Sequence, residues 1–167
     1  MVTTSVLPDS TLKLFHYLQN LSDTMKLSLI ICLLLTLGQS EWLTDFDAAK
    51  ATAVKENKYI LLNFSGSDWC APCIKMRAEV FESQSFLSVA EKDLVLVRAD
   101  FPRLKRNQLP KDQVHRNEEL AERYNPSGKF PLTLLLDSSG RPLKQWDGYV
   151  FGSQDKFIAE LNKVISR

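Results

Sequence analysis

The sequence predicts an α/β fold in which a central mixed β-sheet is flanked by helices on both faces. Apolar runs of strand length alternate with segments of helical periodicity along most of the chain. Helical segments stand between the first three predicted strands, and the last two strands are close enough to form a hairpin. This order of elements is typical of a layered α/β domain.

The first half of the domain contains the first two predicted strands. Residues Glu41 to Asn57 carry apolar side chains along one helical side and predict a helix. The run YILLNF, Tyr59 to Phe64, is too short for a helix and predicts a buried strand. Helices are expected from residue 70 to about Phe81 and over residues 86–90. The run LVLVRAD, Leu94 to Asp100, predicts the second strand.

The second half predicts a helix, a hairpin and a last helix. Asn117 to Tyr124 has a helical pattern that Asn125-Pro126 should stop. The run FPLTLLLD, Phe130 to Asp137, predicts the third strand, and Leu143 to Tyr149 should pair with it across a Ser-Ser-Gly turn. Ser153 can cap a final helix with one apolar face.

Bulk composition limits the function classes. With 167 residues, 44% apolar and 25% charged, the chain suits one globular domain with a sizeable core. The formal net charge is only +1. Nucleic-acid binders normally carry a clear basic excess, so no nucleic-acid partner is expected.

The N-terminal region predicts a secretory signal. Met25-Lys26 is followed by an apolar run, Leu27 to Leu37, and then by small residues suited to cleavage after Ser40. A membrane-spanning helix needs about 20 residues, so the shorter run favours a cleaved signal over an anchor. Residues 1–40 are therefore expected to be leader and signal peptide, with 1–24 either upstream of the true start or an amphipathic leader. The predicted domain is 41–167, and the bacterial periplasm is the predicted compartment.

The stretch WCAPC places two cysteines where a strand ends and a helix begins. The unpaired N–H groups and partial positive charge of a helix N-terminus favour a thiolate at Cys70. Cys73 should face the same side one turn later, at a separation slightly longer than a relaxed disulfide prefers, so that the bond stays reducible. Ala71 and Pro72 separate them, Pro72 being suited to a first helical turn, and Trp69 should shield one side of the sulfurs.

Two other uses of these cysteines are weaker. A purely structural crosslink that closes so short a loop removes little chain entropy. A closed zinc site needs four ligands, and beyond residue 40 the cysteines are joined only by the distant His115. We therefore expect a redox-active Cys70–Cys73 pair, with no metal and no other cofactor.

Several motifs together resemble the thioredoxin superfamily: WCAPC after a strand, the segment YNPSGKFPLTLLL at 124–136, and the following hairpin. The phrases WLTDFDAA and SGSDWC are most similar to secreted bacterial thioredoxin-like proteins related to the DsbD C-terminal domain and chlamydial DsbH. The resemblance covers nearly all of 41–167. It implies that Cys70 attacks, that Cys73 resolves, and that Pro131 is a cis-proline facing the disulfide. The bulky Phe130 before it should bias which partners fit.

The sequence departs from the family pattern on the strand before the motif. Thioredoxins place a buried acid there as proton acceptor for the second cysteine, whereas Asn63 stands nearest here. Asp68, a water or another group would have to assist Cys73. Ala78 replaces a common helix-kinking proline, which predicts a straighter helix.

The residues between the cysteines bear on the direction of reaction. Strongly oxidising relatives hold a histidine there, whose charge stabilises the thiolate. Ala71-Pro72 provides no such charge. The sequence therefore favours a protein-disulfide reductase, with an isomerase or general exchange protein as the alternative and a redox-inactive binding or chaperone module as a further one. Periplasmic isomerases usually add a dimerisation domain, for which residues 41–167 leave no room, and we expect a monomer. Disulfide-containing proteins are the expected substrates, and the resemblance suggests a membrane thiol carrier as electron donor.

The segment Arg103 to Arg116 is rich in lysine and arginine. A nucleic-acid site is implausible in an exported protein. A solvated insertion is the favoured interpretation, and docking of an acidic partner protein is the alternative.

Overall fold

The structure of the protein is a computed structural model that describes residues 41–149 and 152–166. The predictions for the leader, the signal and the cleavage after Ser40 lie outside these residues. Within the described ranges, no helix is both long enough and apolar enough to cross a membrane.

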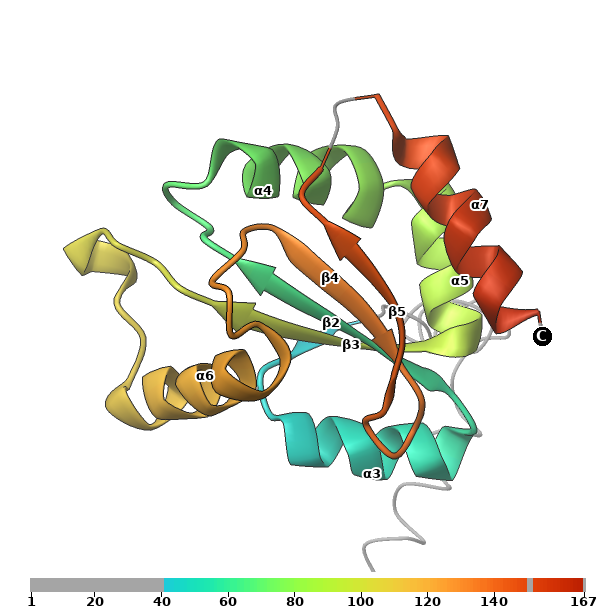
Figure 1. The fold of residues 1–167 in the computed structure, drawn as a ribbon, viewed down its shortest axis with the longest axis horizontal. Coiled ribbons are helices and arrows are strands. Elements are labelled where there is room, and N and C mark those ends of the chain that lie inside the picture. Colours follow the sequence, from blue (N-terminus) through green and yellow to red (C-terminus); the bar gives the residue numbers. More distant parts are fainter. Residues whose placement is uncertain (1–40, 150–151, 167) are drawn as a thin grey trace, which may run out of the picture. The chain divides into compact units, whose positions relative to one another are not determined.

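A five-stranded mixed sheet forms the centre of the domain, in the order β1-β3-β2-β4-β5 (Figure 1). Strands β1 and β2 run parallel to β3, whereas β4 runs antiparallel to both β2 and β5. The strands are β1 (Trp42–Leu43), β2 (Tyr59–Ser65), β3 (Leu94–Asp100), β4 (Leu132–Leu136) and β5 (Pro142–Asp147). The predicted mixed sheet is confirmed.

Helices cover both faces of this sheet, as predicted. One core cluster packs α3 and α6 against the sheet, and the other packs α4, α5 and α7 against the opposite face. The helices are α3 (Phe46–Glu56), α4 (Ala71–Met76), α5 (Gln84–Asp93), α6 (Lys111–Tyr124) and α7 (Gln154–Ile165). In β2, Leu61 faces one cluster while Leu62 and Phe64 face the other. A strand that is buried on both faces reads as a continuous apolar run, which is why β2 is visible in the sequence.

The start of the domain differs from the prediction of one helix over 41–57. Trp42 and Leu43 instead pair with β3 as a short edge strand. Asp45 then caps α3, its carboxylate accepting a hydrogen bond of 2.9 Å from the Ala48 N–H. An aspartate at the N-cap fixes the first turn of the helix. The helix therefore begins at Phe46 and does not include the residues before Asp45.

Helix α6 also begins well before the predicted Asn117. Its inward face carries Gln113 and Asn117, which are both buried. Gln113 Nε2 donates to Asn117 Oδ1 at 2.7 Å, and Asn117 Nδ2 donates to the Asp100 carbonyl at 2.7 Å. Because these inward residues are polar, the first turns of α6 show no apolar periodicity.

The helix after the cysteines is not α-helical throughout. Beyond α4 the chain continues as a π-helical segment, Arg77–Phe81, which contains Ala78. The wider turn of a π-helix lets consecutive residues share one face, and both Val80 and Phe81 are buried. Ala78 thus lies in a π-helical segment, and the straighter helix expected from the missing proline stays a prediction.

Candidate active site

The two cysteines form a disulfide at the N-terminus of α4. Cys70 is the N-cap residue, and its Sγ accepts a hydrogen bond of 3.3 Å from the Cys73 N–H. The sulfurs are 2.03 Å apart and the Cα atoms 5.2 Å apart. That Cα separation lies inside the usual range of about 4.4–6.8 Å, so the expected slight excess of length is not found. Each cysteine is only 4% exposed.

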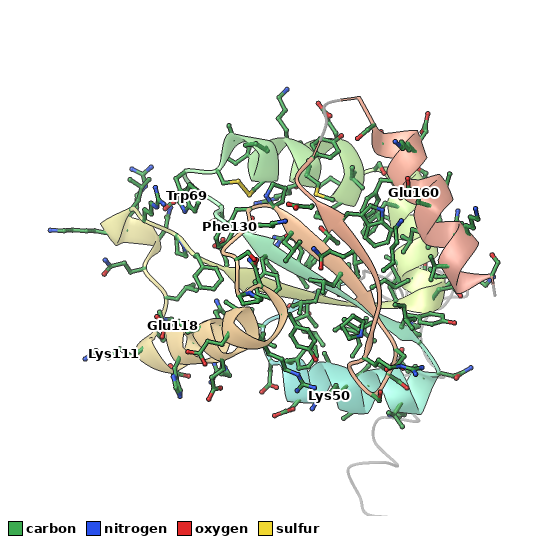
Figure 2. All side chains as sticks on the ribbon, viewed as in Figure 1. Lys50, Trp69, Lys111, Glu118, Phe130 and Glu160 are labelled. Carbon is green, nitrogen blue, oxygen red and sulfur yellow. A yellow bond between two sulfur atoms is a disulfide. The ribbon has the colours of Figure 1, made fainter. Side chains whose placement is uncertain are left out.

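Trp69 belongs to an aromatic cluster beside the disulfide. Its Nε1 donates a hydrogen bond of 2.7 Å to the Phe101 carbonyl. The rings of Trp69 and Phe101 each contact Phe130, with centroids 5.5 and 5.4 Å away. A Cβ atom on Gly66 would lie 2.4 Å from the indole, so only glycine leaves room for this ring. Figure 2 shows Trp69 and Phe130 near the disulfide.

Phe130 and Pro131 enter the site from the neighbouring strand. The peptide bond between them is cis. Phe64 near the end of β2 pairs with Leu132 at the start of antiparallel β4. The loop that carries the cysteines and the loop that carries Pro131 therefore meet at one edge of the sheet. Pro131 is buried, Phe130 is half-buried, Ala71 is exposed and Pro72 lies in the first turn of α4.

Asn63 lies on the sheet face that α4 covers, and its side chain is neutral. Asn63 Nδ2 donates to Thr133 Oγ1 at 3.0 Å, and Thr133 Oγ1 lies 3.8 Å from the Met76 sulfur in α4. Asp68 is engaged elsewhere. Its carboxylate accepts hydrogen bonds of 2.9 Å from the Arg103 and Leu104 N–H groups.

Those contacts change the acidity of Asp68. The hydrogen bond from the Arg103 backbone, followed by one from Asn107 Nδ2, holds the pKa of Asp68 below its ordinary value of 3.8. A carboxylate that stays ionised and already accepts three hydrogen bonds is a poor proton acceptor for Cys73. Asp68 serves instead to connect the cysteine loop to the chain that follows β3.

A cavity of about 280 Å³ reaches Cys73 and is lined in part by charged side chains. Its lining includes Cys73, Arg77, Glu82 and Arg98. Arg98 stands beside Asn63 in the register of β3 and β2, and its guanidinium lies 4.2 Å from the Trp42 ring centroid. Burial is the main cause that lowers the pKa of the Arg98 guanidinium below its ordinary value. Its Nε is buried with no hydrogen-bond partner in the described ranges.

The basic segment is mostly exposed, although Gln113 within it is buried, and it is anchored to the site. The Arg103 guanidinium lies 3.7 Å from the Trp69 ring centroid. A 3-10 turn, Lys105–Asn107, follows and leads into α6. No pattern in the sequence placed Arg98, Phe101 or Arg103 at the site. A charged residue inside the apolar run LVLVRAD was the available signal for Arg98.

The chain gives no sign of a metal centre where it is described. Among residues 41–149 and 152–166, no three histidine, cysteine, aspartate or glutamate side chains are grouped to hold an ion. His115 lies instead on α6 and is 3.3 Å from Glu119. The site thus consists of a disulfide, an aromatic cluster and a cis-proline, and the basic segment is anchored beside it.

Comparisons with known proteins agree with this geometry. The model of a family described as "Thioredoxin-like domain" matches residues 46–165. The "Disulfide bond reductase DsbH" of Chlamydia pneumoniae is 32% identical over 111 residues, covering 66% of this chain and 64% of that protein. The "Thioredoxin-related protein DsbJ" of the same organism is 28% identical over 102 residues, covering 61% of this chain and 28% of that protein. The chain thus spans less than two thirds of either relative.

Solved structures are similar over most of the domain. A structure titled "DsbH Oxidoreductase" superposes with a TM-score of 0.68 at 29% identity, covering 78% of this chain and 88% of the other. The oxidised C-terminal domain of DsbD from Neisseria meningitidis gives a TM-score of 0.51 at 22% identity, covering 74% of this chain and 98% of the other. The similarity to the DsbD domain shows only that the fold is shared.

Proposed function

The chain belongs to the thioredoxin-like domain family, and from this premise we propose that it is a thiol-disulfide oxidoreductase that reduces disulfides in other proteins. The observation that carries the proposal is the Cys70–Cys73 disulfide at the start of α4, beside the cis Phe130–Pro131 bond. The similarity to a relative named as a disulfide bond reductase favours reduction as the direction.

The chemistry takes two exchange steps. In the reduced protein, the Cys70 thiolate attacks one sulfur of the substrate disulfide, which forms a mixed disulfide and releases one substrate thiol after protonation. The Cys73 thiolate then attacks Cys70 Sγ, which closes the Cys70–Cys73 bond and releases the second substrate thiol. Two electrons and two protons pass to the substrate.

Local geometry supports these roles. The Cys73 N–H points at the sulfur of Cys70, and a donor to that sulfur stabilises its thiolate. The pair must be reduced again after each turnover, for which a membrane thiol carrier is the proposed donor. We further propose that the protein is a monomer exported to the periplasm by a signal cleaved after Ser40, with a domain of 41–167. Intact mass and sedimentation of the exported protein test these points.

The equilibrium of the cysteine pair with glutathione tests the direction of reaction. A reductase should hold a low potential, because neither Ala71 nor Pro72 adds charge that would stabilise the reduced form. A high potential would instead support the isomerase or general exchange alternative. Changing both cysteines to serine should abolish reduction of protein disulfides, whereas a binding or chaperone module would keep its activity.

A further inference from the structure

A groove of about 360 Å³ lies between the end of β3 and α6. Its apolar lining comprises Phe101, Pro102, Leu109 and Val114. Val114 is 38% exposed although it is apolar. The groove therefore offers a place for an apolar side chain of another molecule.

This groove is continuous with the site that holds the disulfide. Phe101 lines the groove, accepts the hydrogen bond from Trp69 Nε1, and has its ring against Phe130. Asp68 fixes the chain just beyond Phe101 through the backbone of Arg103 and Leu104. The groove is thus held at a set position relative to the cysteines.

Lys111 lines the groove, and Lys105 and Arg106 lie in the 3-10 turn that precedes α6. Lys105, Arg106 and Lys111 are all exposed, and none has an acidic partner within the described ranges. The neighbouring carboxylates are already engaged: Asp68 accepts from backbone N–H groups, Asp112 pairs with Arg116 at 3.0 Å, and Asp100, which lines the groove, accepts two hydrogen bonds from Ser67. In Figure 2, Lys111 and Trp69 both lie toward the left of the view.

We propose that residues 101–114, which we call the basic arm, dock an acidic segment of the protein whose disulfide is reduced. An apolar side chain of that segment occupies the groove, and carboxylates of the segment face Lys105, Arg106 and Lys111. The proposal rests on the proposed function and specifies its substrate class. Attraction between opposite charges raises the rate of encounter and selects partners by charge, with an effect that salt weakens.

Matched peptides test this proposal. Each peptide holds the same disulfide and the same apolar residue, flanked by aspartate and glutamate in one peptide and by lysine in the other. At low salt, kcat/KM of the intact protein should favour the acidic peptide by about tenfold or more. This preference should shrink as the ionic strength rises.

Two triple variants separate the effect of the basic arm from the effect of the protein's net charge. Lys105→Gln, Arg106→Gln and Lys111→Gln together should remove most of the preference. The matched control, Lys55→Gln, Lys92→Gln and Lys163→Gln, removes the same charge from α3, α5 and α7 and should keep it. These control lysines are exposed and have no ion pair within the described chain. Both variants should reduce bis(2-hydroxyethyl) disulfide, which is small and neutral, at the rate of the unmodified protein.

Three outcomes would overturn the docking proposal: equal rates with both peptides, equal loss of preference in both triple variants, or binding of the basic arm to anionic phospholipid vesicles without any peptide preference. If the unmodified protein fails to reduce the small neutral disulfide, the proposed function fails instead. Calorimetry of the acidic peptide with the Cys70→Ser, Cys73→Ser variant still tests docking in that case, because binding needs no exchange.

Discussion

Asn63 and Thr133 pair across β2 and β4, and Asn63 Nδ2 donates a hydrogen bond of 3.0 Å to Thr133 Oγ1. Both residues are almost fully buried, at 3% and 1% exposed. A neutral pair therefore stands where thioredoxins hold an acid. The pair itself is neutral, so its own contribution to stability should not depend on pH.

Asn63→Asp should make the stability depend on pH. Burial disfavours a carboxylate and raises its pKa above the unfolded value of about 3.9. The folded state then binds more protons, so the free energy of unfolding should fall as the pH rises through the raised pKa, by about 1–3 kcal/mol at pH 7. Urea unfolding between pH 4 and about 8 measures this loss. The exposed Asn162→Asp on α7 is the control, and an equal pH dependence in both variants would contradict the prediction.

Tyr124→Phe should destabilise the protein modestly. The Tyr124 hydroxyl donates a hydrogen bond of 2.8 Å to the Gly140 carbonyl, which holds the β4–β5 turn against α6. Removing the donor leaves that buried carbonyl unpaired, so the free energy of unfolding should fall by about 1 kcal/mol. Tyr59→Phe is the matched control, because the Tyr59 hydroxyl has no partner in the described chain. A similar loss in both variants would show that the hydrogen bond is not the cause.

Asp68→Ala should loosen the basic arm without unfolding the domain. The Arg103 and Leu104 N–H groups lose their acceptor, and their hydrogen exchange should become severalfold faster. In the unmodified protein these bonds are present above the ordinary pKa of 3.8 and are lost as the pH falls through the lowered pKa of Asp68. Hydrogen exchange measured by NMR checks both statements. Glu118→Ala on α6 should leave the exchange unchanged, and no acceleration in Asp68→Ala would refute the anchoring role.

Glu79→Gln should lower the pKa of Tyr149. Burial, followed by the hydrogen bond of 2.7 Å to Glu79, raises the pKa of Tyr149 to about 12. The raised pKa means that protonated Tyr149 stabilises the folded state. This contribution is complete below the ordinary pKa of 10.0 and disappears as the pH rises through about 12. Spectrophotometric titration of the tyrosines should show one group moving toward the ordinary value in the variant. An unchanged titration would mean that burial alone sets the shift.

The sequence was sufficient where local pattern and tertiary structure agree. The run Leu94–Asp100 is apolar and β-branched, and it is found as β3 with its predicted bounds. The start of α6 could not be predicted, because its buried face uses the polar Gln113, which donates to the Thr44 carbonyl far away in the sequence as well as to Asn117 one turn later.

The same contrast holds within the site. The spacing of the cysteines is local and indicated their pairing. By contrast, Phe101 and Arg98 reach the site only through strand order and register, which no local pattern specifies. The partner of Asp68, the backbone after Phe101, was hidden for the same reason.

Arg98→Met should weaken the acidity of the resolving thiol. Arg98 and Cys73 line one cavity, and a nearby cation favours a thiolate over a thiol. In the reduced variant, the pKa of the Cys73 thiol should rise and the second exchange step should slow, while formation of the mixed disulfide with Cys70 keeps its rate. Stopped-flow kinetics against pH separates the two steps. Arg77→Met is the matched control: Arg77 lines the same cavity, but its charge is compensated by Glu82 at 2.8 Å. A resolution step that slows equally in both variants would show that cavity packing, not the charge of Arg98, is responsible.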